Sequence, residues 1–60
     1  MKVYLVMAHY TDGADVKDTW VSGIYRKKED AEKWKSTITK ARDEYEDNGY
    51  SYHIVEGLLQ

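Results

Sequence analysis

The sequence contains no cysteine, no proline and no hydrophobic run long enough to cross a membrane. Without cysteine, disulfide bonds and thiolate metal sites are excluded. A chain of 60 residues buries only about 60% of the surface that its unfolded form exposes, so its core is small. Because neither cross-links nor a large core is available, we expect self-association, as a homodimer, to add the missing stability.

The charged residues show no excess of basic side chains. Nine Lys and Arg residues stand against eleven Asp and Glu residues, and the formal net charge is -2. Proteins that bind nucleic acid or membrane surfaces in general carry a clear basic excess, so neither is expected as a partner. The opening apolar run has no small-residue cleavage site and predicts a strand, so we expect no signal peptide and a cytoplasmic location.

The distribution of apolar residues predicts three strands. Residues 3–10 are apolar or aromatic at almost every position, which is typical of a central strand covered on both faces. Residues 11–18 are rich in turn formers and predict a hairpin loop before a returning strand at 19–25. Residues 50–59 are again aromatic and β-branched and predict the third strand. Gly23, inside the second strand, indicates a bulge or a close approach of the helix, and Gly57 indicates a bulge near the end of the third strand.

Between the second and third strands, the apolar period changes to that of a helix. From Lys28 to about Asp47, apolar residues recur every third or fourth position, and Asn48-Gly49 supplies a helix end. The predicted core stripe is Ala31, Trp34, Ile38, Ala41 and Tyr45. The sequence therefore predicts one α+β domain over residues 1–60, with ββαβ order, an antiparallel sheet of strand order 2-1-3 and one long helix on one face.

One helix covers only one face of such a sheet. Along the first strand, alternate residues form two sets, and each set is largely apolar or aromatic. One set is Val3, Leu5, Met7 and His9, and the other is Tyr4, Val6, Ala8 and Tyr10. A sheet face with several aromatic residues is typical of a partner surface, so we predict the second set as the dimer or partner face. Simple exposure of these side chains to water is the alternative.

No stretch carries a catalytic, cofactor or metal signature. The serines and threonines lie in no nucleophile motif, and no glycine-rich phosphate loop is present, so no enzymatic activity and no cofactor are expected. Asp12, Asp15 and Asp18 recur every third residue, but a calcium loop needs alternating ligands and a distal glutamate. His9 and His53 fall at the same end of the predicted sheet, yet a structural zinc site needs four ligands. We therefore predict no metal site.

Acidic residues gather at the end of the predicted helix. They surround a tyrosine, in the order Asp43, Glu44, Tyr45, Glu46 and Asp47. Carboxylates at this end oppose the helix dipole, at a cost of about 0.3–1 kcal/mol each when exposed. We interpret the cluster as a surface that binds a basic region of another protein, and a merely solvated helix end is the alternative.

Basic residues gather before the helix and in its first half. They are Arg26, Lys27, Lys28, Lys33 and Lys35. With Trp34 or Tyr25 as stacking groups, they would form a nucleic-acid-binding surface. Glu29 and Asp30 interrupt this stretch at once, and Trp34 belongs to the predicted core stripe, so nucleic-acid binding is the alternative rather than the main hypothesis.

Three short segments carry a resemblance to known proteins. KVYLV at residues 2–6, GIY at 23–25 and EDAEKW at 29–34, with a tyrosine-rich last strand, resemble a group of short uncharacterised ββαβ proteins from phages and bacteria. In that group, Ser or Thr usually caps the helix, whereas Arg26 and Lys27 occupy the link here. The resemblance implies an accessory protein of a phage or mobile element.

These observations favour a small, non-enzymatic protein-interaction module. The main hypothesis is a protein that binds a host protein, with components of antiviral defence among the candidates, and inhibits or modulates it. The alternatives are a nucleic-acid-associated module and a small-molecule binder whose pocket forms between two subunits. Fold alone does not distinguish them.

Overall fold

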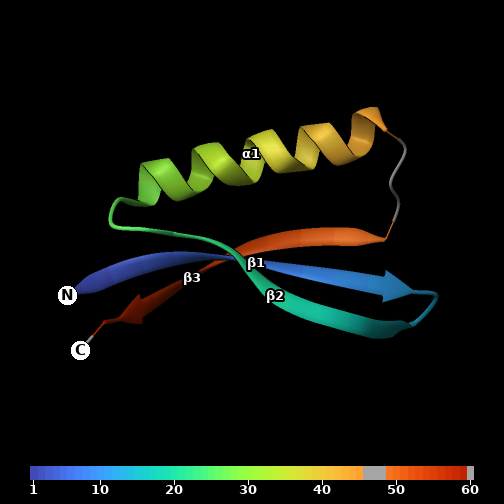
Figure 1. Cartoon of the computed structure of the whole chain (residues 1–60), viewed down its shortest axis with the longest axis horizontal. Helices are drawn as coiled ribbons and strands as arrows, with labels where there is room; N and C mark the ends of the chain where they lie inside the picture. Colours follow the sequence, from blue (N-terminus) through green and yellow to red (C-terminus); the bar gives the residue numbers. More distant parts are fainter. Residues whose placement is uncertain (46–48, 60) are drawn as a thin grey trace.

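The computed structural model describes residues 1–45 and 49–59, and its elements follow the order ββαβ. The elements are β1 (Lys2–Asp12), β2 (Asp15–Tyr25), α1 (Lys28–Glu44) and β3 (Tyr50–Leu58). The strands form a 3-stranded sheet of order β2-β1-β3, and both pairings are antiparallel. Figure 1 shows α1 lying along one face of this sheet. The predicted α+β fold and strand order are confirmed.

The hairpin between β1 and β2 is tighter than predicted. Strand pairing continues to Asp12↔Asp15, so the connection is a short turn through Gly13, not a loop over residues 11–18. Gly13 has a φ of 67°, a left-handed conformation that glycine adopts without steric cost. Because this turn reverses the chain within two residues, the polar stretch on either side can remain in the ladder.

The two strand glycines have different roles. In β2 the pairing shifts between Val6↔Gly23 and Val21↔Met7, which leaves Ser22 as an extra residue in a β-bulge beside Gly23. The pairing of β1 with β3 is continuous, so the bulge predicted at Gly57 is wrong. A Cβ atom at Gly57 would lie 3.1 Å from Leu5 Cδ1, and glycine there leaves room for the leucine to pack across the strand.

The helix begins as predicted and ends earlier. Lys27 is its N-cap residue, with extended backbone and no side-chain capping hydrogen bond, as expected from a link without Ser or Thr. The last helical residue is Glu44, and Tyr45 has left the helical conformation, with φ -93° and ψ 8°. Tyr45 is 77% exposed, so its predicted place in the core stripe is wrong.

Two contacts between α1 and the sheet identify the covered face. Trp34 Nε1 donates to Ser22 Oγ at 2.8 Å, and Arg42 Nε donates to Tyr52 Oη at 3.1 Å. Tyr52 is the cross-strand partner of Ala8, and directly paired residues of an antiparallel sheet share a face. The helix therefore lies over the even-numbered residues of β1, among which Val6 and Ala8 are fully buried.

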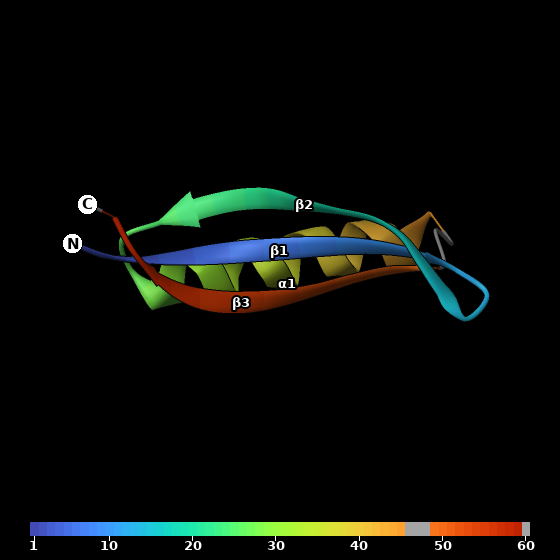
Figure 2. The ribbon, with the colours of Figure 1, turned by 90° about the horizontal axis from the view of Figure 1, so that it is seen from below.

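This placement corrects the predicted partner face. Tyr4, Val6, Ala8 and Tyr10 lie on the side that α1 covers, and the opposite side of the sheet is open. Figure 2, seen from below, shows the sheet in front and α1 behind it. In the part of the chain that the structure describes, the buried hydrophobic residues are Val3, Val6, Ala8 and Ala31. The core is as small as the chain length implies.

Candidate functional site

The uncovered side of the sheet is an unpartnered surface in the described residues. We call it the open face. Its members follow from the register of the three strands: Val3, Leu5, Met7, His9, Thr11, Val16, Thr19, Val21, Ile24, Ser51, His53, Val55 and Gly57. Their side chains are aliphatic or uncharged polar, apart from the two imidazoles. On the edge strands, Ile24 is 63% exposed, and Val21 and Val55 are also exposed.

The polar end of the open face is a connected hydrogen-bond network. His9 Nε2 lies 3.0 Å from His53 Nδ1, and His9 Nδ1 lies 3.0 Å from Thr19 Oγ1. The two imidazole rings are nearly parallel, with centroids 4.7 Å apart. The two histidines meet at one end of the sheet, as the sequence predicted. Among residues 1–45 and 49–59, no group of three or more His, Cys, Asp or Glu side chains is placed to hold a metal ion.

The acidic end of α1 is accessible in its described part. Asp43, Glu44 and Tyr45 are all exposed, and Glu46 and Asp47 of the predicted cluster lie outside the described residues. Arg42, the basic residue of the last turn, turns toward the sheet, where its guanidinium lies 3.9 Å from the centroid of the Tyr50 ring. The side chains at the outer surface of this helix end are therefore acidic and aromatic.

The residues of the predicted basic surface lie in the link before α1 and on two sides of the helix. Arg26, Lys27 and Lys28 are exposed in the link before α1 and at its start. Lys33 lines a hollow on the β2 side of the helix, whereas Lys35 lines a groove on the β3 side. Lys33 and Lys35 thus lie on different sides of the helix.

The proposed stacking group is also engaged elsewhere. The Trp34 side chain is partly buried, and its Nε1 is bonded to Ser22. An indole held against the sheet in this way offers little of its surface to a nucleotide base.

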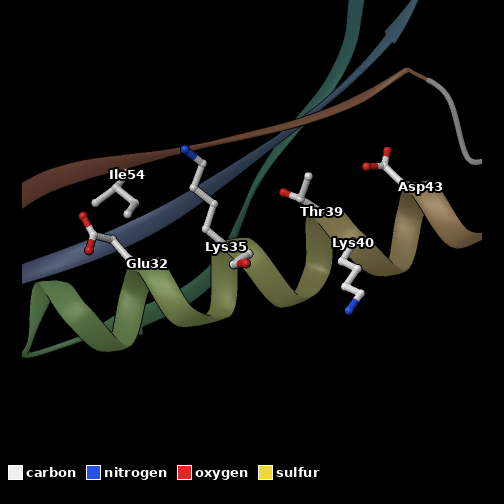
Figure 3. A pocket seen from close by; sticks show the side chains of 7 residues that line it. Glu32, Lys35, Thr39, Lys40, Asp43 and Ile54 are labelled. Carbon is white, nitrogen blue, oxygen red and sulfur yellow. The ribbon is translucent and has the colours of Figure 1, made fainter.

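A groove between α1 and β3 was missed by sequence reasoning. It has a volume of about 520 Å³ and is lined by Glu32, Lys35, Ser36, Thr39, Lys40, Asp43 and Ile54. Figure 3 shows Lys35 extending toward β3, while Lys40 points away from the strands. The spacing of its helix residues, every third or fourth position beside the core stripe, was the signal that could have indicated it. The lining carries both charge signs around one apolar residue.

The aspartates of the hairpin are part of its local structure. Asp12 and Asp15 are paired across the turn, and Asp15 lies 3.9 Å from Lys17 Nζ. Asp18 Oδ1 accepts a 2.9 Å hydrogen bond from the Thr19 backbone N–H. Two of the three aspartate side chains therefore have partners within the hairpin.

Comparison with protein-family models, with curated proteins and with solved structures finds no match to this chain. Of the resemblance to short phage and bacterial proteins, the ββαβ topology is what the structure supports. In the described part of the chain, no helix combines the length and apolar character needed to cross a membrane.

Proposed function

We propose that this chain is a non-enzymatic protein-interaction module, an accessory protein of a phage or mobile element that binds a host protein and inhibits or modulates it. The observation that carries the proposal is the exposure of Tyr45 beside Asp43 and Glu44 at the end of α1. Components of antiviral defence are the proposed class of target, by analogy with the size and charge of the chain.

Stability alone does not account for this arrangement. Carboxylates in the last helical turn interact unfavourably with the helix dipole, at about 0.3–1 kcal/mol each. Tyr45 follows the last helical residue and has 77% of its surface exposed. The spacing of apolar residues along α1 would have allowed it to pack against the sheet. Tyrosine is enriched among the residues that dominate binding energy in protein interfaces, and the flanking charges would attract a basic partner surface.

The test is capture of a host protein by the purified chain and by charge variants. Asp43→Asn/Glu44→Gln is expected to raise the dissociation constant about tenfold, with a weaker dependence on salt. Tyr45→Ala is expected to raise it about tenfold or more, because an aromatic anchor would be lost. The matched control is Glu29→Gln/Glu32→Gln, which removes the same charge from exposed positions near the start of α1.

Two outcomes would contradict the proposal. If no stoichiometric host protein is captured at low or moderate salt, the chain does not have the proposed partner. If the two double variants bind equally well, the acidic end of α1 is not the binding surface.

The groove between α1 and β3 favours a second candidate function, the binding of a small molecule. Its volume of about 520 Å³ is within the roughly 300–1,000 Å³ range of ligand sites. Its lining of Glu32, Lys35 and Asp43 around Ile54 would suit a polar compound with both charge signs. Native mass spectrometry of the protein purified from its host should then show an added mass, which Lys35→Ala would remove.

A further inference from the structure

We infer that the open face is covered by a second copy of the chain, so that two sheets stack face to face with the helices outside. This surface is separate from the acidic end of α1, and the inference does not depend on the proposed function. It specifies the face of self-association, which is opposite to the set Tyr4, Val6, Ala8 and Tyr10.

The exposed area of the isolated chain is the first argument. A folded monomer of 7.0 kDa typically exposes about 4,000 Å². This chain exposes 4654 Å², an excess of about 650 Å² over that expectation. A standard protein interface buries about 800 Å² per partner. Covering the open face would bring the chain close to the exposure of an ordinary folded protein.

The composition of the open face is the second argument. Its accessible apolar half consists of aliphatic side chains from all three strands, which we call the aliphatic patch: Leu5, Val21, Ile24 and Val55. Apolar area of this kind stabilises an interface when it is removed from water. No Asp, Glu, Lys or Arg is among the residues that the register places on the open face. A copy of the same face therefore meets it without repulsion between formal charges.

The polar half of the open face can also be buried at low cost. Both ring nitrogens of His9 are already paired, one with His53 Nδ1 and one with Thr19 Oγ1. Burial of polar groups is costly chiefly when they lose water without gaining another partner. Because both ring nitrogens of His9 are paired within the chain, the His9 imidazole needs no specific partner group from the second sheet.

The small core is the reason to choose a second copy over a different protein. The described part of the chain has only four buried hydrophobic residues, Val3, Val6, Ala8 and Ala31. A domain with so small a core gains stability when its exposed apolar face is covered. A second copy of the chain is present wherever the chain is made, whereas a different protein need not be. Sheets stacked in this way lie about 10 Å apart and share one apolar layer.

The first experiment measures solution mass by sedimentation equilibrium over a wide dilution series. The expected mass is about twice 7.0 kDa, falling toward the monomer on dilution. Val21→Lys should raise the dimer dissociation constant at least about 100-fold, because it would bury an unpaired charge. The matched control, Ser36→Lys on the exposed side of α1, should leave the dissociation constant unchanged.

A second experiment covers the case in which Val21→Lys fails to fold. Because the chain has no cysteine, a single substitution gives one defined cross-linking position. Val55→Cys should form a disulfide-linked dimer or one joined by a short thiol cross-linker. Ser36→Cys should remain largely monomeric under the same conditions, because it lies on the other side of the molecule.

The inference is overturned by a monomer mass at every concentration. It is also overturned by a dimer that forms equally well with a folded Val21→Lys variant, or that cross-links through Ser36→Cys in preference to Val55→Cys. Those last results would indicate pairing through a sheet edge or through the helices.

Discussion

Trp34 Nε1 donates a hydrogen bond of 2.8 Å to Ser22 Oγ, and this bond joins the helix to the bulge of an edge strand. Ser22 is the extra residue of this bulge, and a bulge bends its strand locally. A serine at this point gives a partly buried indole the acceptor that it needs.

Ser22→Ala is expected to lower the free energy of unfolding by about 1 kcal/mol, because the indole N–H loses its acceptor. In a chain of this length, that corresponds to a decrease in Tm of about 4–8 °C. Thermal unfolding followed by circular dichroism measures the change. Ser36→Ala on exposed helix surface is the control and should raise stability by a few tenths of a kcal/mol. Equal effects of the two substitutions would contradict the proposed role of Ser22.

Lys27→Ser is expected to stabilise the protein by about 1 kcal/mol. Lys27 occupies the N-cap position with extended backbone and no side-chain hydrogen bond to the first turn. A serine hydroxyl can accept from that turn, and removal of a positive charge relieves repulsion at the positive end of the dipole. The measurement is the midpoint of urea unfolding, with Arg26→Ser as the neighbouring control. An equal gain from both would indicate a general charge effect instead of a cap.

Substitution of the two turn glycines should have unequal costs. Gly49 has a φ of 96°, and a Cβ atom there would lie 2.6 Å from the Thr11 carbonyl oxygen, which is backbone and cannot rotate away. Gly49→Ala should therefore cost at least about 3 kcal/mol. Gly13 has a φ of 67° and no atom within 4 Å of such a Cβ, so Gly13→Ala should cost only about 1 kcal/mol. Equal losses in chemical unfolding would contradict this distinction.

Arg42→Lys should destabilise the protein by about 1 kcal/mol. The Arg42 side chain both donates to Tyr52 Oη and lies over the Tyr50 ring. A lysine keeps the charge but lacks the planar group that makes both contacts. Lys40→Arg is the reverse exchange at an exposed helix position and should change stability by less than about 0.5 kcal/mol. A neutral Arg42→Lys substitution, measured by thermal unfolding, would show that these contacts contribute little.

Much of the fold was predictable because its signals are local. The change from strand to helix period located the start of α1 at Lys28, and the strand order followed from the apolar character of residues 3–10. The early turn at Gly13 was not predicted, because the polar residues around it are typical of a loop and yet continue the ladder. Tyr45 was misplaced because its spacing fits the stripe, whereas the helix ends one residue before it.

The candidate surfaces were harder to predict, because they depend on contacts between distant residues. Both sides of β1 are apolar or aromatic, so alternation could not decide which side the helix covers. The decision rests on contacts between Trp34 and Ser22 and between Arg42 and Tyr52, whose residues are far apart in the sequence. The histidine network also depends on residues far apart in the sequence. The sequence placed His9 and His53 at one end of the sheet but could not show that they share a hydrogen bond.

The ends of the described chain lie side by side. The Met1 amino group donates to the Leu59 carbonyl oxygen at 3.1 Å, and the Leu59 N–H donates to the Met1 carbonyl oxygen at 2.7 Å. A short peptide could therefore join these ends without unfolding the sheet, and new ends could be opened at the exposed hairpin tip beside Gly13. Because the two ends are adjacent, the domain could also be inserted into a surface loop of another protein. The inserted domain would keep both its open face and its helix.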